Sequence, residues 1–170
     1  MRRTLDRLYG SAAVLAALCM VALLVMVLLS IAGRQLGFNI AGSDAYAGYF
    51  MAGAGFLALA HTLKRGEHIR VTLVLGRLAG PWRRRLELFA LSLSTLLAAL
   101  FAYYGCRLAW VSFQLHDIST SADATPLWLP QLSMAAGTLV LAVACLDELV
   151  LELTGTRVAP TTGEEPLRNE

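Results

Sequence analysis

Four stretches of the chain are long, apolar and free of Asp, Glu, Lys and Arg: residues 10–33, 45–63, 88–106 and 127–146. A transmembrane helix needs about 20 predominantly apolar residues. A single charged side chain at the centre of such a helix disfavours insertion by about 2.5–3.5 kcal/mol. The four stretches therefore predict an all-α membrane protein with four transmembrane helices.

The composition argues against a soluble domain with buried helices. The 170 residues are 57% hydrophobic and only 15% charged, whereas soluble domains carry about 25% charged residues. A net charge of +2 is too small to indicate a nucleic-acid partner. We expect one membrane domain over residues 1–152, followed by a polar tail over residues 153–170. The first stretch is longer than the 7–15 apolar residues of a signal peptide, so we expect it to be a retained span.

The distribution of Lys and Arg predicts the orientation. The N-terminus, the connection between the second and third spans, and the tail together hold twelve of these residues, and the other two connections hold only Arg34 and Arg107. Cytoplasmic loops carry the excess of Lys and Arg. Both termini, and therefore the tail, are predicted to be cytoplasmic.

The connection between spans two and three predicts an amphipathic helix over residues 68–79. Val71, Val74, Leu75 and Leu78 fall on one helix face. Such a helix lies in the plane of the lipid headgroups with its apolar face in the membrane. A strand is the alternative, but an unpaired strand there would leave backbone groups unsatisfied.

Aromatic and basic residues next to the spans are predicted to anchor the protein at the membrane surface. Arg107 is expected to extend to the outer headgroups, and the alternative is that it faces a partner subunit. The predicted anchors are Trp82, Arg83, Arg84, Arg85, Arg107, Trp110 and Trp128.

Span two is rich in Ala and Gly, and Gly48, Ala52 and Gly55 recur at helical spacing. Small residues on one face allow helices to approach closely in lipid. The stripe predicts a packing face, within this chain or against a partner, and the alternative is an ordinary, loosely packed span.

Two helix starts carry capping signals. Ser43 is expected to cap the second helix, with Asp44 favourable in its first turn. Thr125 is expected to cap the fourth helix, with Pro126 at the first helical position and Pro130 in the first turn.

The chain lacks the chemistry of an enzyme or of a complete carrier. Carriers keep ionisable residues inside the membrane. In the four stretches, His61 is the only strongly titratable side chain. A haem anchor commonly needs a histidine pair facing across the bundle. Cys19, Cys106 and Cys145 lie in apolar stretches without CxxC spacing. We therefore expect no catalytic, substrate-binding or metal site and no cofactor, and interpret the chain as part of a larger assembly.

Two segments resemble a known family, the DctQ-like small membrane subunits of TRAP transporters. The first is "SDAYAGYFMAGAGFLALAHTLKRGEHIRVTLVLGRL", residues 43–78, and the second is "TPLWLPQLSMAAGTLVLAV", residues 125–143, with Gly137 as its central small residue. The most specific part is the turn "RGEHIRV", with Arg65, Gly66, Glu67, His68 and Arg70. Ser43 and Asp44 match the acidic opening of span two. The chain departs from the family pattern at Ala45 and Thr72, where relatives often carry acids.

The resemblance implies a subunit of a three-part, ATP-independent uptake system of the bacterial inner membrane. A large permease subunit would be its stable partner, using a sodium gradient, and a periplasmic binding protein its transient partner, delivering a small organic acid. The 107–126 segment could offer that binding protein an outer surface. The alternatives are a small homodimeric carrier and the membrane anchor of a redox complex.

Overall fold

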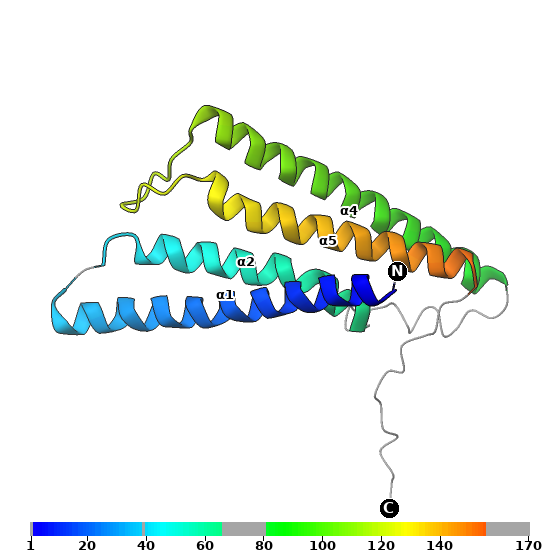
Figure 1. Cartoon of the computed structure of the whole chain (residues 1–170), viewed down its shortest axis with the longest axis horizontal. Helices are drawn as coiled ribbons and strands as arrows, with labels where there is room; N and C mark the ends of the chain where they lie inside the picture. Colours follow the sequence, from blue (N-terminus) through cyan, green and yellow to red (C-terminus); the bar gives the residue numbers. More distant parts are fainter. Residues whose placement is uncertain (1, 39, 66–80, 156–170) are drawn as a thin grey trace, which may run out of the picture.

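The computed structural model describes residues 2–38, 40–65 and 81–155, in which four helices and one isolated β-bridge occur (Figure 1). The helices are α1 (Arg2–Leu36), α2 (Ser43–Arg65), α4 (Pro81–Leu115) and α5 (Trp128–Leu153). Each contains one of the four uncharged stretches, except that the last stretch begins one residue before α5. The all-helical prediction is confirmed for these ranges, and α4 continues through Arg107 to Leu115.

Three of the helices, α1, α4 and α5, are long and apolar enough to cross a membrane by length and composition. The shorter helix α2 is not among them, because its many Gly and Tyr residues and His61 lower its mean hydropathy. The membrane crossing by α2 therefore stays a prediction.

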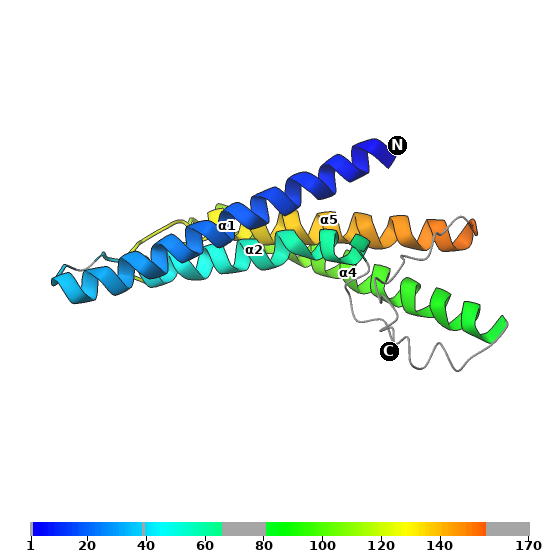
Figure 2. The same cartoon turned by 90° about the horizontal axis from the view of Figure 1, so that it is seen from below.

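The helices form an open row instead of a closed bundle. Along the row, α1 packs against α2, α2 against α5, and α5 against α4, whereas α1 meets α5 at only a few positions. Figure 1 shows the four helices side by side in this order, and Figure 2 shows α1 and α4 diverging toward the end that holds the N-terminus. The two inner helices thus each have two neighbours, and α1 and α4 have one main neighbour each.

Small residues form the interior of the row. The buried apolar residues are mostly alanines; the set is Tyr9, Ala12, Ala16, Ala54, Leu57, Ala60, Ala98, Ala102, Ala109, Ala135, Ala144 and Cys145. Close packing between small side chains is the usual basis of helix association in lipid, because the hydrophobic effect does not drive helices together there. The row is therefore held by close helix approach along narrow seams.

Helices α2 and α5 approach each other very closely at Gly137. A Cβ atom added at Gly137 would lie 2.5 Å from the backbone carbon and oxygen of Phe56, too close for any side chain. The neighbouring seam between α4 and α5 has Gly105 against the hydroxyl of Thr138, which is fully buried. That hydroxyl donates to the carbonyl oxygens of Met134 (2.9 Å) and Ala135 (3.0 Å), so no polar group is left unpaired there.

The predicted cap at Thr125 is wrong. Helix α5 begins at Trp128, and its N-cap residue is Leu127, whose side chain makes no capping hydrogen bond. Thr125 lies in the preceding connection, where a bridge between Ile118 and Pro126 holds the chain. Its backbone oxygen accepts a hydrogen bond from the amide of Ser119 (2.8 Å), and this fixes Thr125 outside the helix. Pro130 does lie in the first turn, and Asp44 lies in the first turn of α2, as predicted.

Replacing Gly137 with Ala should lower the free energy of unfolding by about 1–3 kcal/mol, because the added methyl forces the α2 and α5 backbones apart. The matched control is Gly55→Ala, where a Cβ meets nothing within 4 Å, and where the change should be neutral or slightly stabilising. Thermal unfolding of both variants in detergent measures the difference. Equal stability of the two variants would contradict the close contact of α2 and α5 at Gly137.

Candidate functional site

The open row leaves broad apolar surfaces uncovered. Large side chains on α1, such as Leu18 and Leu24, and on α4, such as Phe89 and Leu96, are each more than half exposed. Soluble monomers rarely expose apolar patches of more than a few hundred Å², and larger patches mark membrane or protein contacts. These surfaces require lipid or a partner protein on both sides of the row.

The predicted small-residue stripe lies mainly on an exposed side of α2. Gly48 and Gly55 are exposed, Ala52 is half-buried, and a Cβ at either glycine would have open space. Met51, between the two glycines, is 66% exposed. Nothing in the row uses this bare side of the helix, so its role as a packing face stays a prediction that needs a partner.

Helix α2 packs within the chain through a different set of small residues, which the sequence reasoning missed. Gly53 lies between Cys19 of α1 and Ser133 of α5, so a Cβ there would be 3.2 Å from the Cys19 sulfur. Ala54 and Ala60 are buried on the same part of α2. The spacing of these residues could be read from the sequence. However, the sequence has two small-residue faces in this helix and does not show which of them packs within the chain.

At one end of the row, the connection between α4 and α5 is fastened to the start of α2. The hydroxyl of Tyr49 donates to Asp123 Oδ2 (3.2 Å), and a hydrogen bond joins Thr125 Oγ1 to the hydroxyl of Tyr46 (3.1 Å). Gly42 lies directly against Asp123: an added Cβ would be 2.5 Å from the Asp123 Cβ, and the Gly42 φ of +80° also favours glycine. We call this group, Gly42, Tyr46, Tyr49, Asp123 and Thr125, the loop clamp.

The hydroxyl groups around Asp123 lower the pKa of its carboxyl group. The largest contribution is a hydrogen bond from Thr125, and desolvation opposes it; hydrogen bonds from Ser119 and Tyr49 act in the same direction as Thr125. Each of these bonds favours the charged carboxylate. The lowered pKa therefore favours the ionised form of Asp123, whose Oδ2 accepts the hydrogen bond from Tyr49.

At the other end of the row, Lys64 joins three helices. Its ammonium group pairs with Asp147 and, at 3.3 Å, with Glu148, both on α5. The ammonium also lies 5.4 Å from the ring centroid of Tyr9 on α1, within cation–π range. The side chains of Lys64, Asp147 and Glu148 are at most a quarter exposed. We call Tyr9, Lys64, Asp147 and Glu148 the lysine cluster.

The predicted family motif falls largely outside the described residues. Arg65 ends α2, and Gly66, Glu67, His68 and Arg70, together with the predicted helix over 68–79, lie outside. Ser43 and Asp44 begin α2, with Ser43 buried and Asp44 exposed.

The predicted surface anchors Trp82, Arg83, Arg84, Arg85 and Trp128 lie at helix starts, whereas Arg107 and Trp110 lie within the last third of α4. Trp82 is exposed at the start of α4, and the guanidinium of Arg85 lies 5.3 Å from its ring centroid. Arg84 is exposed in the same turn, and the side chain of Arg83 is not described. Toward the other end, Arg107 and Trp110 are exposed, and Trp128 packs edge-on against Phe113 at 5.6 Å. Their role as anchors stays a prediction.

None of the arrangements suits metal or acid–base chemistry. Within residues 2–38, 40–65 and 81–155, no group of three or more His, Cys, Asp or Glu side chains is placed to hold a metal ion. The charged groups that do come together, Lys64 with Asp147 and Glu148, are engaged in ion pairs. The described residues provide apolar surfaces and a fixed arrangement of helices.

Replacing Lys64 with Met should destabilise the chain by about 2 kcal/mol, between the values for exposed and fully buried ion pairs, because Asp147 loses its cation. Thermal unfolding of the purified chain measures the loss. The triple variant Lys64→Met, Asp147→Asn, Glu148→Gln should recover part of it, since no charge is then left unpaired. A Lys64→Met variant as stable as the wild type would contradict the assigned role.

Acidification should loosen the loop clamp. The folded-state pKa of Asp123 is lowered, so its contribution to stability is present above the unfolded pKa of about 3.9 and is lost as the pH falls through the folded pKa. The protection factors of the amides of Ser119 and Leu127, both hydrogen-bonded in this connection, compare each exchange rate with the intrinsic rate at the same pH, and they should fall on acidification.

In Asp123→Asn these protection factors should already be low at neutral pH and should respond less to acid. The control Asp117→Asn changes an acid in the same connection outside the clamp and should leave the protection factors at neutral pH unchanged. Wild-type protection factors that do not depend on pH in this range would refute the role of Asp123.

Comparison with known proteins connects this architecture to a family. The comparison with curated proteins finds no match. The family model described as "Tripartite ATP-independent periplasmic transporters, DctQ component" matches residues 23–155, well over half of the chain. The matched region includes the last part of α1, from residue 23, all of α2, α4 and α5, and both the loop clamp and the lysine cluster except for Tyr9. The chain thus belongs to the DctQ family, the small permease component of TRAP transporters, and is a multi-pass membrane protein.

Proposed function

We propose that the chain is the scaffold subunit that packs against the large permease subunit of a TRAP transporter in the bacterial inner membrane. The observation that carries the proposal is the open row, with its broad exposed apolar surfaces on either side of the inner helices. A chain that completed its own carrier would enclose a path between its helices, whereas this row has no closed interior. The family to which it belongs is one of transporter components, not of enzymes.

The orientation in this proposal has both termini in the cytoplasm, with all four helices of residues 1–152 crossing the membrane. The excess of Lys and Arg in the N-terminus, the α2–α4 connection and the tail supports it. The lysine cluster then lies at the cytoplasmic surface and the loop clamp at the periplasmic surface. The substrate-binding protein would meet the periplasmic side transiently, over residues 107–126.

The proposed contact with the large subunit is the bare side of α2. Gly48 and Gly55 leave the helix backbone open to close approach by another helix. A rigid row fixed to that subunit would give its moving part a stationary support during transport. The sodium gradient and the small organic acid substrate enter the proposal through the family resemblance.

The first test is co-purification of the tagged chain with the products of neighbouring genes in mild detergent. A stoichiometric large membrane protein is expected, and uptake in cells should be lost when this chain is deleted while the large subunit is kept. Full uptake by the large subunit without this chain would overturn the proposal. So would transport by this chain alone in liposomes, which would instead support a homodimeric carrier.

The packing face is tested with the double variant Gly48→Leu, Gly55→Leu. Because both positions have open space, the variant should fold normally but lose the co-purified large subunit. The control Ala17→Leu adds the same kind of bulk at an exposed position of α1 and should retain it. Loss of the partner only in the α1 variant would place the contact on α1 instead.

A further inference from the structure

A polar pocket with a volume of about 270 Å³ lies at the turn between α1 and α2, and we call it the turn pocket. Its wall is mostly polar and combines an arginine with an aspartate; the lining residues are Ser30, Gly33, Arg34, Gly37, Phe38, Ile40, Ser43 and Asp44. The amide of Phe38 donates to the carbonyl oxygen of Gly33 (3.0 Å), and a Cβ added at Gly33 would lie 3.3 Å from the Phe38 ring. The turn therefore folds back onto the end of α1 and forms one side of the pocket.

The turn pocket lies at the edge of the hydrocarbon layer, on the side of the loop clamp. Arg34 directly follows the uncharged stretch of α1, and Asp44 directly precedes that of α2. Gly42, two residues before Asp44, contacts Asp123 of the loop clamp. Figure 1 shows the α1–α2 turn and the α4–α5 connection at the same end of the row. Both charged residues are therefore at the headgroup level of the same leaflet.

The two charged residues of the turn pocket are not paired. Arg34 and Asp44 are both exposed, and neither has an oppositely charged side chain within 4 Å in the described part of the chain. An anion in the pocket would be attracted by Arg34 but repelled by Asp44, and a cation would meet the opposite pair of forces. A ligand that carries one group of each sign can pair with both residues at once. The charges of the pocket thus favour a zwitterion.

An apolar surface continues from the turn pocket into the membrane. Ile31 and Val27 precede Arg34 by three and seven residues, so they lie on the same edge of α1. They are 52% and 40% exposed, and Leu24, about one turn further along, is 57% exposed. A ligand with its polar end in the pocket can therefore place apolar chains along α1. A phospholipid with an ethanolamine headgroup combines a phosphate, a primary ammonium group and acyl chains in this order.

We propose that the turn pocket binds the headgroup of a zwitterionic phospholipid that carries a primary amine. The lipid phosphate binds the Arg34 guanidinium through paired hydrogen bonds, and the ammonium group pairs with the Asp44 carboxylate. The hydroxyl groups of Ser30 and Ser43 add hydrogen-bond donors to the wall. The acyl chains lie along the Ile31 edge of α1, in the leaflet on the side of the loop clamp. This assignment does not depend on which subunit the chain binds.

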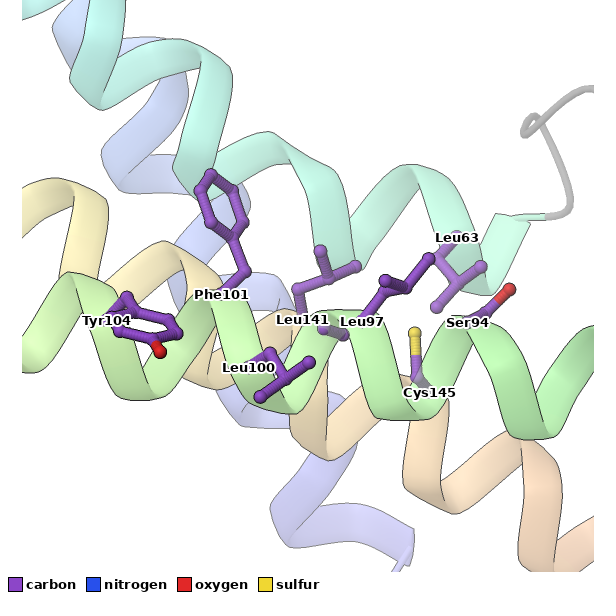
Figure 3. A pocket seen from close by; sticks show the side chains of 9 residues that line it. Leu63, Ser94, Leu97, Leu100, Phe101, Tyr104, Leu141 and Cys145 are labelled. Atoms are coloured by element: carbon purple, nitrogen blue, oxygen red, sulfur yellow. The ribbon is translucent and has the colours of Figure 1, made fainter.

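The larger groove of the molecule lacks the features of such a site. It has a volume of about 600 Å³ and lies between α2, α4 and α5, nearer to the lysine cluster. Figure 3 shows its apolar and aromatic lining, which includes Leu97, Phe101 and Leu141. Among the described residues that line it, none is charged. The groove therefore has no means of selecting a headgroup, and it supplies a control for the test.

The site is tested by native mass spectrometry of the full chain released from nanodiscs that contain phosphatidylethanolamine, phosphatidylcholine and phosphatidylglycerol in equal amounts. The wild type should retain phosphatidylethanolamine in preference to the other two lipids. Phosphatidylcholine has the same charges, but its quaternary ammonium group cannot donate a hydrogen bond to Asp44. Phosphatidylglycerol has no cation. Retention of the three lipids in equal proportions would overturn the proposal.

Two variants of the turn pocket should change lipid retention in different ways. Arg34→Gln should lower the retained phosphatidylethanolamine at least about tenfold, the loss expected for a hydrogen bond to a charged group. Asp44→Asn should abolish the preference for phosphatidylethanolamine over phosphatidylglycerol, because it removes both the attraction for the ammonium group and the repulsion of the anionic lipid. A variant that kept the wild-type preference would overturn the role of the residue it changes.

The matched controls are Arg107→Gln and Asp117→Asn. They change an exposed arginine and a half-buried acid of the α4 end and its connection, and neither residue lines the turn pocket. A third control, Leu97→Trp, obstructs the larger groove. All three should keep the wild-type preference. Loss of phosphatidylethanolamine in Leu97→Trp alone would move the lipid to the groove and overturn the assignment to the turn pocket.

Two other occupants are distinguished by further measurements. Soluble phosphoethanolamine, which is the headgroup without acyl chains, should not displace the lipid at millimolar concentration. Displacement would assign the turn pocket to a free zwitterion. A cysteine placed by Arg34→Cys should not cross-link to the large permease subunit in the co-purified complex. An efficient cross-link would assign Arg34 to a protein contact and overturn the lipid site.

Discussion

The close backbone contact between α2 and α5 at Gly137 is the interaction on which the rest of the row depends. It brings the two inner helices within van der Waals distance of each other's main chain, where no side chain larger than hydrogen fits. The outer helices are then added one to each side, α1 on α2 and α4 on α5. Widening this seam would separate the α1–α2 pair from the α4–α5 pair, because the other links between the two pairs are few: the loop clamp, the lysine cluster, the contact of Phe56 with Phe101 and a few contacts of α1 with α5.

The two polar groups hold the inner pair in register from opposite ends. The loop clamp attaches the connection before α5 to the first turns of α2, and the lysine cluster attaches the last turn of α2 to the last third of α5. Between them the seam is made largely of small side chains, which make few directional contacts. Polar contacts at the ends supply the directional bonds that a smooth alanine and glycine seam lacks.

The four helices could be predicted from the sequence because each is marked by an uncharged stretch. Their order in the row could not, since a stripe of apolar residues does not say which neighbour it meets. The Gly48 and Gly55 stripe illustrates this: it is regular, yet the chain itself packs through Gly53. The Lys64 ion pairs were missed although the sequence held a clue. Lys64 and Asp147 each follow directly after an uncharged stretch, and the second and fourth spans run in the same direction, which brings those two ends to one membrane surface.

The prediction of a helix cap at Thr125 was wrong for a related reason. Capping signals are local, and the Thr125 hydroxyl instead meets Tyr46, 79 residues earlier in the chain. Pro130 and Asp44 were placed well because their preferences concern only their own helix. For the same reason Trp82 could be placed at a helix start, whereas the ring contact of Phe56 with Phe101 depends on two helices that are not consecutive in the sequence.

In the described part of this protein the buried side chains are mostly small, and most of the large apolar ones are exposed. Mutations at the outer positions can therefore change what the protein contacts without changing how its helices meet. Natural variation at these outer positions can change which partner the surface binds while the contacts between the helices stay the same. A fold arranged in this way can diverge widely in sequence and still present the same backbone.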